Sequence, residues 1–259
     1  MSSADAKDHT IFVPTQTAMQ SDAGAPTTTS ARNLESVRNY VDSTSTDRVS
    51  ILAELMRLGR PTPVTPAYDA PGMHEVLSTV GEGGEHNGYL LVRPSDQSGA
   101  FVYGVRVNAR EMVETGDKFH ISIEASQLEV AFAELSVLLF SDDCPFDQWK
   151  LADPSVTGDQ GRVGAGAQIT LYADQVLTSV DATVASQAAQ IKDFISQIEG
   201  RLSNAGVRAG IVPESDVRYL KWSYCSYRND RHSDRDGVQA SLNLFEPLFQ
   251  LMGDSNIVK

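Results

Sequence analysis

The chain has 259 residues, and 34 acidic against 21 basic side chains give it a formal net charge of -13. With 41 % hydrophobic residues it can bury a sizeable core, so the composition excludes a chain that is disordered throughout. The acidity argues against nucleic acid and anionic membranes as partners, because phosphate contacts need an excess of Lys and Arg. No stretch approaches the roughly 18 consecutive apolar residues of a transmembrane helix.

Common motifs give no function. Two cysteines, Cys144 and Cys225, are too few for a disulfide framework, and we interpret both as packing residues of a reduced protein. The five histidines show no H-x-x-x-H pair, so we expect no metal and no cofactor. The glycines from 81 to 84 lack the Lys-Ser/Thr of a phosphate-binding loop, and there is no G-x-S-x-G nucleophile motif.

The first half of the chain gives weak structural signals. Residues 1–30 are rich in Ser and Thr and hold one aromatic side chain, which predicts a disordered tail before a folded domain at 31–259. Apolar residues at helical spacing predict a helix between Asp47 and Gly59. Prolines from 61 to 71 indicate an extended connection, glycines from 81 to 88 a loop, and residues 89–92 and 101–107 two strands.

The second half is clearer. Residues 118–123 alternate, which places Phe119 and Ile121 on a core face and Lys118 and His120 together on the opposite one. A capping box at 126–129 predicts a helix to about 139. Further strands are expected at 168–173 and 221–228, a long helix at 181–204, and a last helix at 238–252 interrupted at Pro247. Without a regular βαβ repeat, we predict a single α+β domain with a mainly antiparallel sheet flanked by helices.

Cations gather at the ends of these predicted elements. Any one of them alone is typical of a solvated surface. Together with the polar face of the 118–123 strand they form a candidate anion pocket, because Arg binds phosphate through two parallel hydrogen bonds and Lys as a point charge. The set comprises Lys118, His120, Lys150, Arg162, Arg228, Arg231 and Arg235.

Several segments of this half resemble one protein family. The run G-D-K-F-H-I-S-I at 116–123 is similar to the G-D-K-F-H-I-S segment of the OspF/SpvC-like phosphothreonine lyases, which bacterial type III secretion systems deliver. The similarity continues in the same order to the C-terminus, through L-L-F-S at 138–141, D-Q-W-K at 147–150, G-A-Q-I-T-L-Y at 166–172, E-S-D-V at 214–217, S-Y-R-N at 226–229 and D-R-D-G at 234–237. The first 115 residues match weakly or not at all.

The resemblance implies an activity and a site. Those enzymes remove phosphate from phosphothreonine in the pThr-x-pTyr activation loop of host MAP kinases by β-elimination. By resemblance, Lys150 is the general base and His120 the general acid. A lysine needs a lowered pKa to act as a base at pH 7, and we expect the cations Arg162 and Lys118 and partial burial beside Trp149 to lower it. Lys118, Arg162, Arg228 and Tyr172 would hold the phosphothreonine phosphate, Arg235 the phosphotyrosine, and Asp216 would orient the cations.

The resemblance also implies a setting. The protein would be a monomeric effector, secreted through a type III system into the host cytoplasm or nucleus. Its first 30 residues would serve export, binding of a secretion chaperone and docking, although Lys7, Ile11 and Val13 match the family's kinase-docking motif poorly. Two further departures concern the phosphotyrosine subsite: Asp174 stands where the family has Lys, and the second arginine after Arg228 is displaced by one position, to Arg231.

Two alternatives stay open on the sequence. One is a non-catalytic phosphopeptide-binding module that sequesters kinases with the same arginines. The other is an ordinary phosphatase, which is disfavoured because the chain has neither a metal cluster nor a C-x₅-R nucleophile loop.

Overall fold

A computed structural model describes residues 47–59, 61–94, 99–109, 115–158, 161–173, 181–233 and 237–253. The expectations for the first 30 residues therefore fall outside the described part. Within it, no helix is long and apolar enough to cross a membrane. The same residues hold no group of three or more His, Cys, Asp or Glu side chains that could bind a metal ion.

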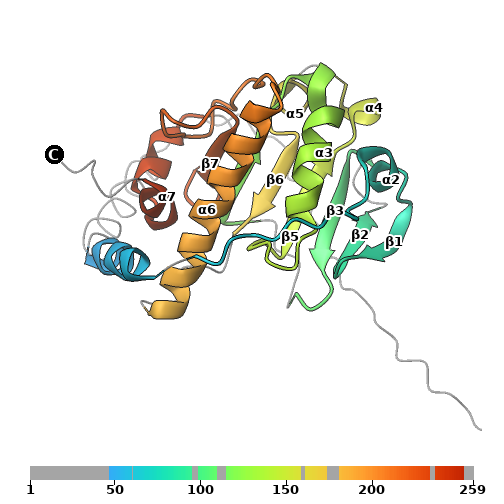
Figure 1. The fold of residues 1–259 in the computed structure, drawn as a ribbon. Coiled ribbons are helices and arrows are strands. Elements are labelled where there is room, and N and C mark those ends of the chain that lie inside the picture. Colours follow the sequence, from blue (N-terminus) through green and yellow to red (C-terminus); the bar gives the residue numbers. More distant parts are fainter. Residues whose placement is uncertain are drawn as a thin grey trace, which may run out of the picture.

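Seven strands form one sheet in the order β1-β2-β3-β5-β6-β4-β7 (Figure 1). Each neighbouring pair is antiparallel, which confirms the predicted α+β class. Strand β4 lies between β6 and β7, so the strand that opens the family resemblance is flanked by two strands that follow it in the chain. The strands are β1 (Gly81–His86), β2 (Tyr89–Arg93), β3 (Phe101–Arg106), β4 (Asp117–Ile121), β5 (Gln148–Ala152), β6 (Ile169–Tyr172) and β7 (Cys225–Asn229).

Two long helices, α3 (Leu128–Leu139) and α6 (Ala182–Asn204), lie across one face of this sheet (Figure 1). The predicted helix at 181–204 is confirmed, with the Asp181 carboxylate accepting hydrogen bonds from the first-turn N–H groups of Thr183 and Val184. The remaining helical segments are a first helix at 47–58, α2 (Met73–Leu77), η1 (Ala125–Gln127), α4 (Pro154–Thr157), α5 (Gly161–Ala165), η2 (Ala240–Phe245) and α7 (Pro247–Met252).

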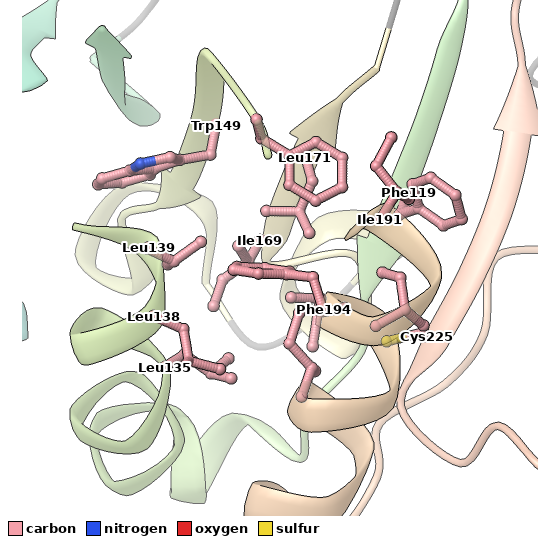
Figure 2. Close-up of a cluster of buried hydrophobic side chains, with 14 of the residues drawn as sticks. Phe119, Leu135, Leu138, Leu139, Trp149, Ile169, Leu171, Ile191, Phe194 and Cys225 are labelled. Carbon is pink, nitrogen blue, oxygen red and sulfur yellow. The ribbon is translucent and has the colours of Figure 1, made fainter. Parts of the chain in front are cut away.

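The core fills the space between the sheet and these two helices. Figure 2 shows Phe119, Trp149 and Leu171 pointing from three strands toward side chains of α3 and α6. All three are fully buried. Because side chains alternate along a strand, their chain neighbours Lys118, Lys150 and Tyr172 belong to the opposite face, here called the polar face.

Both cysteines are buried, and burial raises the pKa of both thiols. Each is therefore a poor nucleophile at neutral pH. The interpretation of Cys144 and Cys225 as packing residues is confirmed.

Three local expectations are wrong. Residues 81–86 form the edge strand β1 rather than a loop, and β1 turns into β2 through Asn87 and Gly88, both with positive φ. Such a pair is the favoured two-residue hairpin turn, and an exposed edge strand needs few apolar side chains. The capping box does not form, because the Ser126 hydroxyl donates to Glu124 and η1 precedes α3.

The last strand is also shorter than predicted. Strand β7 begins only at Cys225, because the N–H groups of Ser223, Tyr224 and Cys225 donate to the Glu199 carboxylate of α6 at 2.8 to 3.0 Å. A carboxylate from the covering helix thus takes the place of a neighbouring strand.

Candidate active site

Two rows of side chains cross the polar face of the sheet. In each row the residues are paired in register between adjacent strands, so they lie side by side although they are far apart in the sequence. One row runs Tyr103, Lys150, Thr170, His120 and Ser226, and the next runs Gln148, Tyr172, Lys118 and Arg228.

His120 lies in the first row and is only 2 % exposed. Its Nδ1 is 2.6 Å from the Asp216 carboxylate, which leaves Nε2 as the ring nitrogen that can face a substrate. Burial lowers the pKa of His120 to about 4; Asp216 opposes this effect, and the guanidinium groups of Arg162 and Arg228 add to it. With these neighbours the imidazole is neutral at pH 7.

Asp216 accepts hydrogen bonds from several side chains in this part of the site. Its two oxygens also accept hydrogen bonds from the hydroxyls of Ser226 at 2.7 Å and Ser215 at 2.9 Å. Burial alone would raise the pKa of this carboxyl, but the charge and hydrogen bond of His120 and the two serine hydroxyls hold it well below its usual range. Asp216 is thus a permanent negative charge that fixes the tautomer and orientation of the histidine.

A second carboxylate, Asp230, lies beside the second row. It forms an ion pair with Lys118, and its Oδ2 is 3.5 Å from Nη2 of Arg228. The Gly116 N–H donates to its other oxygen at 2.8 Å. Burial would raise the pKa of Asp230, but Lys118, Gly116 and Arg228 together lower it, so this carboxylate is also charged at pH 7.

Aromatic rings surround the ammonium group of Lys150. The Nζ atom lies 4.3 Å from the ring centroid of Phe101 and 5.7 Å from those of Tyr103 and Tyr172. Tyr172 is shared, since the Nζ of Lys118 lies 5.3 Å from its centroid. Contacts of this kind favour the protonated amine, because the face of an aromatic ring attracts a cation.

Arg162 reaches the same region from the short helix α5. Its Nη2 is 3.6 Å from Oδ1 of Asp216, which is longer than a hydrogen bond. Its Nε is buried and has no hydrogen-bond partner among the described residues. Buried hydrogen-bond donors normally have a partner, so this guanidinium is placed to donate a hydrogen bond to an oxygen atom of a ligand.

The charges of the cluster have a definite balance. Four cations surround two carboxylates, and His120 is neutral, so the described cluster carries two net positive charges. A phosphate monoester brings a charge of about -1.5 to -2 at pH 7. The arrangement therefore suits one phosphate group. The cations are Lys118, Lys150, Arg162 and Arg228, and the carboxylates are Asp216 and Asp230.

Seven of the eight predicted site residues are brought together on the polar face or directly beside it: Lys118, His120, Lys150, Arg162, Tyr172, Asp216 and Arg228. Arg235 and Asp174 lie outside the described residues. Arg231 is exposed and follows the end of β7.

One expectation about the surroundings of Lys150 is wrong. The Trp149 ring does not flank its amine but packs into the core against Tyr89, Phe132 and Phe140, because adjacent residues of a strand face opposite sides. Sequence reasoning missed the residues that take its place, Phe101 and Tyr103, and also Asp230, Ser215 and Ser226. Alternation along the predicted strands could have placed Ser226 and Tyr103 on the polar face.

Solved structures of phosphothreonine lyases share this fold. The VirA (SpvC) phosphothreonine lyase effector of Chromobacterium violaceum is 35 % identical to this chain with a TM-score of 0.70, over 85 % of this chain and 98 % of that one. The type III effector OspF of Shigella flexneri is 32 % identical with a TM-score of 0.67, over 80 % and 98 %. The fold and the cationic site thus define a protein of the phosphothreonine lyase class.

Sequence comparison assigns the family. The OspF/SpvC family model matches residues 14–254, and the chain belongs to this family. The phosphothreonine lyase OspF of Shigella flexneri is 40 % identical over 172 residues, which cover 64 % of this chain and 70 % of that protein. The MAPK phosphothreonine lyase of Salmonella typhimurium is 39 % identical over 180 residues, or 66 % and 73 %. The resemblance stated from the sequence is confirmed.

Proposed function

We propose that this phosphothreonine lyase eliminates phosphate from a phosphothreonine side chain with Lys150 as general base and His120 as general acid. Lys150 takes the Cα proton, a Cα=Cβ double bond forms, and the Cβ–O bond breaks with its electron pair passing to the phosphate. His120 gives a proton to the departing oxygen. The products are an unsaturated residue and inorganic phosphate, and because no bond to water is made, the threonine is not restored.

The main support for this proposal is the row of side chains that contains Lys150, Thr170 and His120. The two reactive groups lie two strands apart on one face, a separation of roughly 10 Å between backbones at the usual strand spacing. The small side chain of Thr170 stands between them. A phosphothreonine can bind over Thr170 with its Cα toward the Lys150 amine and its ester oxygen toward the His120 imidazole.

The second row and α5 would bind the phosphate. Lys118, Arg228 and Arg162 supply charge and hydrogen-bond donors, and the Tyr172 ring is contacted by the ammonium groups of both lysines. The net charge of the cluster matches a phosphate dianion, and the buried Nε of Arg162 offers a donor to it. Binding of phosphate would raise the pKa of His120 and so generate the acid that the elimination needs.

The resting charges explain why substrate must complete the site. The aromatic rings favour a charged Lys150, and burial keeps His120 neutral, which is the reverse of the states in which each would act. A phosphate beside His120 draws a proton onto the imidazole. Transfer of a proton from Lys150 to His120, directly or through water, would then place both groups in their working states.

The substrate and setting follow from the relatives. We propose the pThr-x-pTyr activation loop of a host MAP kinase as the substrate, with Arg235 at the phosphotyrosine and Asp174 weakening that subsite. We further propose a monomer that a type III system exports into the host cell, with residues 1–30 serving export, chaperone binding and docking, and residues 31–259 forming the lyase domain.

Mass spectrometry of a treated phosphothreonine peptide tests this function. A lyase leaves a residue one water lighter than the threonine that a phosphatase would leave, and a binding module leaves the peptide unchanged. Lys150→Met should abolish the dehydrated product while the variant still binds the peptide. Lys221→Met, at an exposed lysine before β7, is the control and should react as the wild type does. Full turnover by Lys150→Met would remove Lys150 from the mechanism.

A further inference from the structure

Among the residues that the structure describes, Phe101 is the aromatic side chain nearest to Lys150, with 4.3 Å between Nζ and the ring centroid. This distance is well within the roughly 6 Å over which a ring face attracts a cation. Phe101 lies outside the segments that carry the family resemblance, and the function proposed above uses it only as one of the rings that favour a charged Lys150. Its ring is partly buried, so water screens the contact only in part.

The backbone before Phe101 is held in place from two sides. Arg93 donates to the Gly99 carbonyl oxygen at 2.6 Å and pairs with the Asp153 carboxylate at 2.9 Å. The N–H of Asp153 in turn donates to the carbonyl oxygen of Ala100 at 2.8 Å. The partly buried ion pair joins the end of β2 to the residue after β5. The hydrogen bonds to Gly99 and Ala100 then tie both of its members to the start of β3, which fixes the position of the ring.

The sheet register brings the ring to the amine. Phe101 pairs with Ala152, two residues beyond Lys150 on β5, so ring and lysine are diagonal neighbours on the polar face. Because Ala152 is small, the lysine chain can lean toward the ring. The contact therefore follows from the register and from a pinned strand end.

We propose that Phe101 is a positioning residue for the base: its ring face holds the Lys150 nitrogen and stabilises the positive charge that develops there as the Cα proton arrives. This inference rests on the proposed function of Lys150. A ring face attracts an ammonium group and not a neutral amine, so the contact strengthens during proton transfer. Phe101 thus makes Lys150 a stronger base as well as orienting it.

Fluorinated phenylalanines at position 101 separate this role from packing. Each added fluorine weakens the negative potential of the ring face and leaves its size nearly unchanged. Across the series of one, two and three fluorines we expect the limiting kcat on a phosphothreonine peptide, taken from the pH range in which Lys150 is fully deprotonated, to fall stepwise by roughly two- to five-fold in total. The acidic limb of the pH profile should move to lower pH in the same order, with KM unchanged.

Other groups near Lys150 stay constant across the series. These are the Lys118 ammonium, the phenols of Tyr103 and Tyr172, His120 in the same row, and Arg162 with Asp216 beside it. Phe101→Tyr keeps the ring and should retain wild-type values, whereas Phe101→Leu should lose at least as much kcat as the trifluoro protein. The same fluorines at Phe146, which is buried in the core against Phe119 and Phe194, form the control.

A direct measurement keeps this proposal separate from the proposed function. Titration of the Lys150 Cε signal by NMR should show the ammonium losing its proton at progressively lower pH as fluorines are added, whether or not the protein is catalytic. A flat series at Phe101, or an equal response at Phe146, would overturn the role of the ring. Absence of dehydrated product from the wild type would instead refute the proposed function.

Discussion

Replacing Asp216 by Asn removes one buried negative charge and, with it, the ion pair with Nη2 of Arg162 at 3.6 Å, while the shape of the side chain is kept. The amide oxygen can still accept from His120 and Ser226, which both bond to Oδ2 of the carboxylate, and the amide nitrogen then takes the place of Oδ1. That nitrogen faces the Ser215 hydroxyl, which can rotate to accept a hydrogen bond. The substitution therefore tests the charge of Asp216 rather than its shape.

The magnitude follows from the hydrogen bond to His120. A bond to a charged partner is worth about 1–2 kcal/mol more than a neutral one, and a protonated His120 loses that support. If His120 protonates the leaving phosphate, kcat falls roughly 5- to 30-fold. The cluster also gains one net positive charge, so KM for a phosphothreonine peptide should stay equal or decrease.

Steady-state kinetics and NMR measure the two effects. Phosphate release gives kcat and KM, and the pKa of His120, already lowered to about 4, should fall further in Asp216→Asn. Asp230→Asn is the matched control, because Asp230 contacts Lys118 and Arg228, whereas the carboxylate bonded to His120 is that of Asp216. It removes the same charge from the cluster and should leave the histidine titration nearly unchanged.

Two results would refute this reasoning. If Asp216→Asn keeps kcat within two-fold of the wild type, the carboxylate does not support an acid at His120. If Asp230→Asn lowers kcat and shifts the histidine titration equally, Asp216 acts only through the total charge of the cluster.

Three further predictions concern stability and binding. The pKa of His120 is about 4 when folded and 6.5 when unfolded, so the unfolded chain binds more protons between these values. The free energy of unfolding should therefore fall by up to about 3 kcal/mol as pH drops from 6.5 to 4. Urea unfolding of His120→Gln should show a smaller fall over this range, and a fall equal to that of the wild type would contradict the prediction. Inorganic phosphate should raise the pKa of His120, which an NMR titration with and without saturating phosphate measures. An unchanged titration would show that His120 does not lie beside the phosphate subsite. Gly104→Ala should destabilise the fold by about 1–3 kcal/mol in urea, because its Cβ would lie 2.3 Å from the Trp149 ring, whereas Gly84→Ala on the exposed edge strand should be nearly neutral.

The sequence predicted the faces of the strands better than their neighbours. Alternation at 118–123 separated Phe119 from Lys118 and His120, and this division is the one that the sheet makes. It succeeded because the side-chain direction along a strand is a local property. Local signals failed where a distant group intervened, as at Ser223, whose N–H is taken by Glu199 of α6.

The roles of the site residues had a different origin. Periodicity and composition led only to a candidate anion pocket, and the base and acid came from resemblance to the lyase family. The structure adds Asp230, Phe101 and Tyr103, whose contacts with Lys118 and Lys150 join residues 47 to 112 positions apart in the sequence. No spacing rule along the chain connects Phe101 with Lys150.

By itself, the sequence determined the fold class, the strand faces and, through motif resemblance, the family. Only the tertiary structure decided that β4 lies between β6 and β7, that the Phe101 ring lies against Lys150, and that two carboxylates reduce the cluster to two net positive charges. The reason is physical: alternation is set by each strand's own backbone, whereas the charge and reactivity of the site depend on which strands pair and what burial then brings together. A chain with a net charge of -13 can therefore hold a cationic phosphate site.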